Sequence, residues 1–121
     1  MNNFPSIWMD TICTGDPRQV LNMYLPNAIL VATYDPNILR GHQQLLGYFN
    51  RFMAKEGLCG KIQSTYVQPI GRFKVFSGLY KFQFTEDGEI KSVNARYTFV
   101  LVPTHAGWKI AEHHSSEVPD A

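Results

Sequence analysis

The segments ARYTFV at residues 95–100, GWKI at 107–110 and HHSS at 113–116 decide how this chain folds. Aromatic and β-branched residues favour strands, and the short polar turn at 104–107 predicts that two antiparallel strands pair here. Residues 112–116, Glu-His-His-Ser-Ser, are polar at every position although successive side chains of a strand point to opposite faces. One of the two faces points toward the protein, so the sequence predicts a polar interior or a polar interface.

The first half of the chain carries helical signals instead. Apolar residues recur at helical spacing in three segments, and we expect helices near 5–14, from Pro17 to Pro26, and at about 42–55. Gly57 is the expected end of the third helix, whose apolar stripe includes Phe49. Between the second and third helices we expect a short buried strand at 28–32 and a turn at 34–37.

Asp16 and Gln19 stand where a capping box would begin the second helix, and Gly15 fits the end of the first. Four longer strands follow the helices, near 61–68, 73–84, 90–102 and 107–116. Helices followed by a meander of strands predict an α+β fold, with three N-terminal helices packed on a strongly curved, mostly antiparallel sheet. The mouth between helices and sheet is a natural pocket. The whole chain, 1–121, is expected to be one domain.

The composition is that of an ordinary soluble globule, with 45% hydrophobic and 17% charged residues. Eleven basic and ten acidic residues give a net charge of +1 without a basic run, so we expect no nucleic-acid partner. No apolar stretch approaches the roughly 20 residues that span a bilayer. The start of the chain lacks the charged and apolar regions of a signal peptide, so the expected location is cytoplasmic.

The two cysteines, Cys13 and Cys59, do not have metal-ligand spacing. In a cytoplasmic protein we expect them to be buried and reduced. The alternative is a disulfide between the two. His42 and His105 fall at a helix start and in a turn, where neither completes a ligand set. We therefore expect no metal and no cofactor.

Several segments together resemble the nuclear transport factor 2-like superfamily. Within it they are similar to the branch related to the association (hub) domain of calcium/calmodulin-dependent protein kinase II, whose bacterial members are free-standing domains. The segments that carry the resemblance are Gly15-Asp16, YLPNA at 24–28, GLYKF at 78–82, and the ARYTFV, GWKI and HHSS segments quoted above.

The resemblance implies a cone-shaped, cystatin-like fold in which a bent antiparallel sheet wraps around a long helix. It also implies assembly through the sheet, as homodimers or rings of dimers. It does not imply a kinase, because the sequence has no Gly-rich loop and no catalytic-loop motif. The fold hosts isomerases, cyclases, dehydratases and binding modules, so it does not define the function.

Arg96 is the first candidate for a ligand-binding residue. If its face of the strand is the concave one, a guanidinium lies inside an aromatic cavity, near Tyr80 or Tyr34 and one of the two adjacent histidines. It would then need a partner, which could be a carboxylate, a small anionic ligand or several carbonyls. The alternative is an internal salt bridge from Arg96 to Glu112 or Asp35, because buried charges are usually paired.

His113 and His114 point to opposite faces of their strand, so at most one of them lines the pocket. The other is expected on the outer face, at an oligomer interface. Each is a candidate ligand-binding residue, and the alternative is a structural, hydrogen-bonded histidine. Ser115 and Ser116 are expected to form hydrogen bonds at the strand end. Some kinase hub domains carry an arginine near the position of Ser115, and its absence here argues against carrying over their pocket for acidic ligands.

Asp35 is the candidate catalytic residue. Tyr34-Asp35-Pro36 followed by Gly41 is similar in placement to the catalytic Asp-Pro of ketosteroid isomerases, in which a carboxylate abstracts a proton next to a carbonyl. Trp8 falls near the position of the tyrosine donor on the first helix of those enzymes and is a further ligand-binding candidate. The alternatives are a turn at Asp35-Pro36 and simple core or interface packing for Trp8 and Tyr80.

These observations favour a non-enzymatic domain that binds a small anionic or apolar ligand, oligomerises, or does both. The alternative is a small isomerase- or dehydratase-like enzyme with Asp35 or a pocket histidine as general base. A third class, a protein-interaction subunit, would show an exposed apolar patch on the outer face of the sheet.

Overall fold

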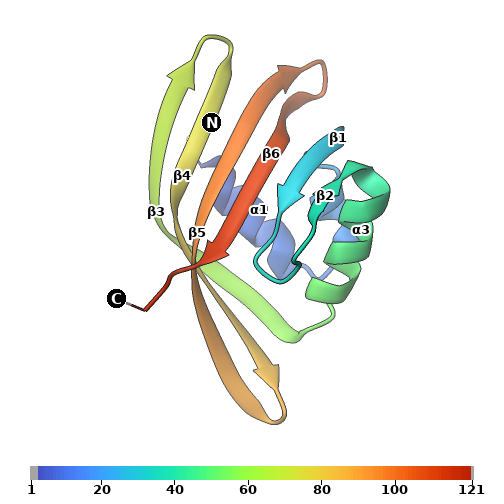
Figure 1. Ribbon diagram of the computed structural model, residues 1–121, viewed down its shortest axis with the longest axis vertical. Coiled ribbons are helices and arrows are strands. Elements are labelled where there is room, and N and C mark those ends of the chain that lie inside the picture. The colour runs from blue at the N-terminus through green and yellow to red at the C-terminus, as the bar shows by residue number, and fades with distance from the viewer. Residues whose placement is uncertain (1–2, 121) are drawn as a thin grey trace.

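The computed structural model describes residues 3–120, so Met1, Asn2 and Ala121 of the predicted domain lie outside the described residues. Three helices pack on one side of a six-stranded, curved sheet, which confirms the predicted α+β fold (Figure 1). The elements are α1 (Phe4–Cys13), α2 (Pro17–Leu21), β1 (Tyr24–Val31), β2 (Ile38–Arg40), α3 (Gly41–Phe52), β3 (Glu56–Ile70), β4 (Phe73–Glu86), β5 (Glu89–Thr104) and β6 (Gly107–Glu117).

The strand order in the sheet is β2-β1-β6-β5-β4-β3. Every neighbouring pair is antiparallel except β1 and β6, which run parallel and place Leu30 beside His113. The sheet is therefore mostly antiparallel, as predicted, with one parallel pairing. That pairing brings the N-terminal strand against the polar segment of β6, and this contact positions the site described below.

The second predicted helix is too long, because α2 ends at Leu21 and Tyr24 begins β1. Pro26, the predicted end of that helix, lies inside a strand. The pairing of β1 with β6 shifts register between Tyr24 and Ile29, so the missing N–H of Pro26 falls in an irregular part of the ladder. At the other end of α2, Asp16 Oδ1 accepts a hydrogen bond from the Arg18 amide at 3.0 Å, as expected of an N-cap.

The third helix and its neighbours also differ in their bounds. α3 ends at Phe52, and Gly57, the expected stop, lies in β3 with φ +66°. The short strand β2 was not predicted. Phe49 is 1% exposed and packs in the core between α3 and the sheet, as expected of the apolar stripe.

The expectation of reduced cysteines is wrong. Cys13, at the end of α1, and Cys59, in β3, form a disulfide across 46 residues of sequence. Their Cα atoms lie 4.5 Å apart because α1 packs against β3, and this distance is within the usual range for a disulfide. The bond ties the first helix to the edge strand of the sheet.

The inner face of the sheet is aromatic. On β5, Tyr97, Phe99 and Leu101 are buried against the helices, while Arg96 and Thr98 alternate onto the opposite face. Among residues 3–120, no helix is long and apolar enough to cross a membrane.

Candidate functional site

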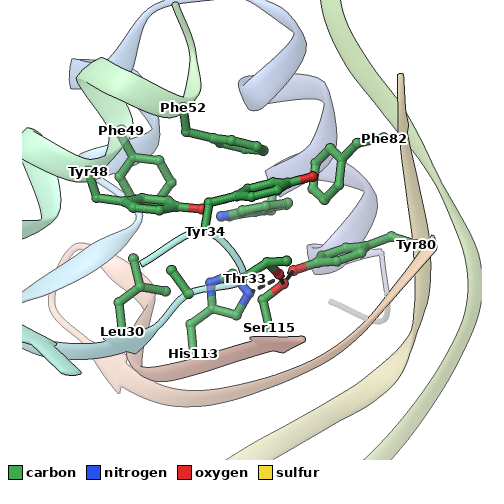
Figure 2. Close-up of a pocket in the computed structure, with 12 residues that line it drawn as sticks. Leu30, Thr33, Tyr34, Tyr48, Phe49, Phe52, Tyr80, Phe82, His113 and Ser115 are labelled. Carbon is green, nitrogen blue, oxygen red and sulfur yellow. Dashed lines mark hydrogen bonds between the residues drawn. The ribbon is translucent and has the colours of Figure 1, made fainter. Parts of the chain in front are cut away.

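A small cavity lies between the sheet, α1 and α3, with a volume of about 20 Å³. Its walls come from three strands, two helices and the loop after β1, so distant parts of the sequence converge on it (Figure 2). The lining residues are Trp8, Leu30, Ala32, Thr33, Tyr34, Tyr48, Phe49, Phe52, Tyr80, Phe82, His113 and Ser115.

The two sides of the cavity differ in chemistry. Figure 2 shows the rings of Tyr34, Tyr48 and Phe52 on one side. On the other side lie Ser115 and His113, both buried and both on β6. The cavity is therefore apolar except along one wall.

The polar wall begins with a hydrogen-bonded group around His113. Trp8 Nε1 donates to Tyr24 Oη at 3.1 Å, and Tyr24 Oη lies 2.8 Å from His113 Nδ1. The imidazole is 2% exposed and is held edge-on to the Trp8 indole, with ring centroids 5.2 Å apart. α1, β1 and β6 each contribute one of these three side chains, so the group depends on the parallel pairing of β1 with β6.

The second nitrogen of His113 continues the hydrogen-bonded chain. Nε2 lies 3.2 Å from Tyr80 Oη, which in turn donates a short hydrogen bond to Ser115 Oγ. Ser115 Oγ lies 2.8 Å from Thr33 Oγ1, in the loop after β1. Among the described residues the chain of contacts runs from the Trp8 indole to the Thr33 hydroxyl, and both imidazole nitrogens are engaged within it.

Burial holds the ionisable members of this chain in their neutral forms. Burial, and to a smaller degree the neighbouring His114, lowers the pKa of His113 to about 3, so the imidazole is uncharged at neutral pH. Burial raises the pKa of Tyr80 and of Tyr24 above the usual tyrosine value, so both phenols keep their protons. The site therefore contributes hydrogen bonds and no net charge.

The cavity reaches solvent beside the loop after β1. Tyr34 is 41% exposed, whereas most of the other lining side chains are buried. Its ring packs against Phe52 at a centroid distance of 5.8 Å, and the Lys55 ammonium lies 5.1 Å from the centre of the ring. Tyr34 is thus the residue at the mouth of the cavity.

Four of the ligand-binding candidates from the sequence come together at this site. His113, Tyr80, Tyr34 and Trp8 all line the cavity, and Trp8 stacks on Tyr80 with ring centroids 5.6 Å apart. The two histidines point to opposite faces, as predicted: His113 is inside and His114 is exposed.

The placement of Arg96 in the cone interior is wrong. Its side chain is exposed on the outer face of β5, because the larger apolar residues of that strand, Tyr97 and Phe99, occupy the inner face. The alternative salt bridges are also wrong: Asp35 pairs with Arg51, and within residues 3–120 no ion pair joins Arg96 to Glu112.

Asp35 lies in the loop between β1 and β2 and outside the cavity lining. Its Oδ1 accepts a hydrogen bond from the Asn37 amide at 2.9 Å, and its Oδ2 is 2.9 Å from Arg51 Nη2. This is the turn that was the alternative interpretation of Asp35-Pro36. A catalytic role for Asp35 stays a prediction that these contacts do not favour.

The sequence did not identify Tyr24, Thr33 and Ser115 as site residues. Ser115 follows His113 by two residues on the same strand, so both side chains point to the same face. With His113 inside, alternation also places Ser115 in the cavity. Tyr24 falls within the predicted second helix, so no local signal in the sequence indicates its contact with His113. In the part of the chain that the structure describes, no group of three His, Cys, Asp or Glu side chains is arranged to hold a metal ion.

A family model described as a SnoaL-like domain matches residues 2–121. The chain therefore belongs to the SnoaL-like domain family, and the nuclear transport factor 2-like resemblance of the sequence is confirmed. No curated protein matches the chain.

Solved structures agree with this assignment. A protein from Xanthomonas campestris, described as a proposed calcium/calmodulin dependent protein kinase II association domain, is 30% identical with a TM-score of 0.90, over 98% of this chain and 86% of its own. A proposed dehydratase of the NTF2-like family from Streptomyces avermitilis is 18% identical, with a TM-score of 0.85, over 96% of this chain and 92% of its own.

A ketosteroid isomerase-like protein from Erwinia carotovora atroseptica is 16% identical, with a TM-score of 0.79, over 96% of this chain and 92% of its own. At these lower identities, the likeness to the Streptomyces and Erwinia proteins shows the fold alone.

Proposed function

We propose that this protein is a non-enzymatic domain that binds a small, neutral, mainly apolar molecule in the cavity beneath Tyr34. The observation that carries the proposal is the state of His113, which is neutral, buried and hydrogen-bonded through both ring nitrogens. A general base needs a lone pair within reach of its substrate, and the Nδ1 and Nε2 atoms of this imidazole already face Tyr24 and Tyr80. The contacts therefore favour binding over proton abstraction.

The charge of the lining determines the kind of ligand. The twelve lining residues include no Arg, Lys, Asp or Glu, and Arg96 lies on the other face of the sheet. A carboxylate in this cavity would lose its hydration without gaining a cationic partner, which is costly. A flat apolar molecule, in contrast, would contact the rings of Tyr48 and Phe52.

Binding requires the mouth of the cavity to open. The cavity volume is about 20 Å³, whereas a cavity that binds benzene has a volume of about 150 Å³. Tyr34 is the exposed residue of the lining and belongs to a loop, so rotation of its side chain is the simplest way to make room. The ligand would then occupy the place of the Tyr34 ring against Phe52.

Thermal unfolding with matched neutral and anionic arenes tests this proposal. Toluene and benzyl alcohol at about ten times their Kd are expected to raise the melting temperature by about 5 °C, and benzoate is expected to leave it unchanged. The Ala32→Leu variant, which fills the cavity, should lose the shift, whereas Arg96→Ala should keep it. A shift with benzoate that Arg96→Ala abolishes would contradict the proposal.

We further propose that two copies associate through the outer face of the sheet. Figure 1 shows α1 behind β5 and β6 and, in the described part of the chain, no helix in front of them. This face presents Leu79, which is 40% exposed, beside Arg96 of β5 and Ser116 of β6 in register. Two observations support a symmetric homodimer: no helix within residues 3–120 covers this face of the sheet (Figure 1), and the chain is similar to a protein described as an association domain.

A further inference from the structure

The hydrogen-bonded chain along the cavity wall has a direction that its donors determine. An indole nitrogen can only donate, so the Trp8 N–H must donate to Tyr24 Oη. The Tyr24 hydrogen then has one acceptor among its described contacts, His113 Nδ1 at 2.8 Å. A neutral imidazole that accepts at Nδ1 carries its hydrogen on Nε2 and donates it to Tyr80.

The direction continues from Tyr80 to the mouth of the cavity. Tyr80 Oη receives the imidazole hydrogen and donates its own to Ser115 Oγ. Ser115 and Thr33 then share one hydrogen bond, in which either hydroxyl can be the donor. Whichever of them donates, the other keeps an O–H that has no further partner among the described residues.

The hydrogen count is the same for both arrangements of the hydroxyls. Six groups each contribute one hydrogen, and five hydrogen bonds use five of them. The remaining hydrogen lies on Thr33 or on Ser115, and both side chains line the cavity. The cavity wall therefore ends in a spare hydrogen-bond donor.

We propose that the spare O–H selects a ligand that is a hydrogen-bond acceptor and not a donor, namely a neutral carbonyl compound on a flat apolar frame. This inference rests on the proposed binding function and names the ligand class for the same cavity. A ligand that lacks an acceptor would cover the spare O–H without bonding it, and burying an unpaired donor is unfavourable. A ligand that only donates leaves the same hydrogen unpaired.

Calorimetric titration with three bicyclic molecules of similar size tests the inference. Indane has no polar group, 1-indanone has a carbonyl acceptor, and indole has an N–H donor. We expect 1-indanone to bind at least about tenfold more tightly than indane, with indole no tighter than indane. If 1-indanone and indane bind equally, or if indole binds most tightly, the inference is wrong while the proposed binding function stands. If none of the three binds, the proposed function itself fails.

A measurement on His113 tests the direction of the chain without any ligand. In the ¹⁵N spectrum of histidine-labelled protein at pH 7, His113 should appear as the neutral tautomer with the hydrogen on Nε2. The Nδ1-protonated tautomer would reverse the chain and overturn the inference.

The Tyr24→Phe variant removes the group that sets this direction. It should reduce the preference for 1-indanone over indole at least severalfold, although residue 24 does not line the cavity. Tyr48→Phe is the matched control, because it removes a phenol that lines the cavity and takes no part in the chain. An unchanged preference in Tyr24→Phe, with tautomer and folding verified, would also count against the inference.

Discussion

At the scale of single residues, His113 makes stability depend on pH. Its pKa is lowered to about 3 by burial and by His114, whereas a histidine in an unfolded chain has a pKa of about 6.5. Below about pH 6.5 the His113 imidazole binds a proton in the unfolded state, whereas in the folded state it stays neutral until the pH approaches about 3. The free energy of unfolding therefore falls as the pH drops from about 6.5 toward the folded pKa.

We expect the wild type to lose about 2–3 kcal/mol of stability between pH 7 and pH 4.5 through this residue alone. The measurement is urea unfolding at a series of pH values, for the wild type and for His113→Gln. The variant is less stable overall, and its pH profile should be flatter by that amount because the other titrating groups are common to both proteins. Parallel profiles would show that His113 is not held neutral.

The same scale shows what sequence patterns can and cannot assign. Alternation correctly separated His113 from His114 and Arg96 from Tyr97, but it did not say which face is inside. On β5 both faces contain apolar or β-branched residues, so the volume of Tyr97, Phe99 and Leu101 decided the question in favour of the aromatic face. The single guanidinium on the other face did not outweigh the apolar volume of these three side chains.

At the scale of elements, the contact between β3 and β4 depends on Gly78. A Cβ at this position would lie 1.9 Å from the Ser64 carbonyl oxygen and 2.8 Å from Tyr97 Oη. The register of the two strands shifts between Ile62 and Ser64, so the backbones approach closely beside this glycine. Tyr97 Oη uses the same space to donate to the Ser64 carbonyl at 3.0 Å.

Gly78→Ala should therefore force the two strands apart and destabilise the protein by about 3 kcal/mol. Ser77→Ala, one residue earlier on the same strand, should cost less than about 1 kcal/mol, because it removes one long hydrogen bond. Chemical unfolding of both variants provides the comparison. Equal stabilities would contradict the close approach of the strands.

The disulfide is the second prediction at this scale. Closing 46 residues of sequence restricts the unfolded chain, so the Cys13→Ser, Cys59→Ser double variant should be less stable by about 2–4 kcal/mol. The denatured wild type should show no free thiol until a reductant is added. Two thiols that react in the absence of reductant would contradict the pairing.

Element boundaries show why part of the fold could be predicted and part could not. The last three strands and their turns follow from local signals, and their predicted bounds are within two residues of those observed. Tyr24 and Pro26, in contrast, carry helix-end signals that are overridden by the parallel pairing with β6, about 86 residues later in the sequence. Because the predicted helix ran past this boundary, the sequence did not indicate the contact between Tyr24 and His113 at the centre of the site.

At the scale of the whole molecule, the outer face of the sheet is the proposed dimer interface. Leu79 lies on this face beside Arg96, and a glutamate in its place would bury a charge between two sheets. Leu79→Glu should therefore convert the dimer to a monomer without lowering the thermal stability of the fold itself. Light scattering coupled to gel filtration at high micromolar concentration measures this change.

Ile90→Glu is the matched control, because Ile90 is 76% exposed near the turn between β4 and β5. This variant should have the same molar mass in light scattering as the wild-type dimer. A wild-type protein that is monomeric at this concentration would exclude the proposed assembly, and a dimer that survives Leu79→Glu would place the interface elsewhere.

The stacking of Trp8 on Tyr80 has an optical consequence. Trp8 is 1% exposed, lines the cavity and donates its indole N–H to Tyr24, whereas Trp108, the other tryptophan, is half-buried beside Lys74. In a Trp108→Phe protein, all indole fluorescence would come from the cavity wall. A molecule that entered beside Tyr34 would change the emission of that single fluorophore, so occupancy could be followed in stopped-flow experiments without a label.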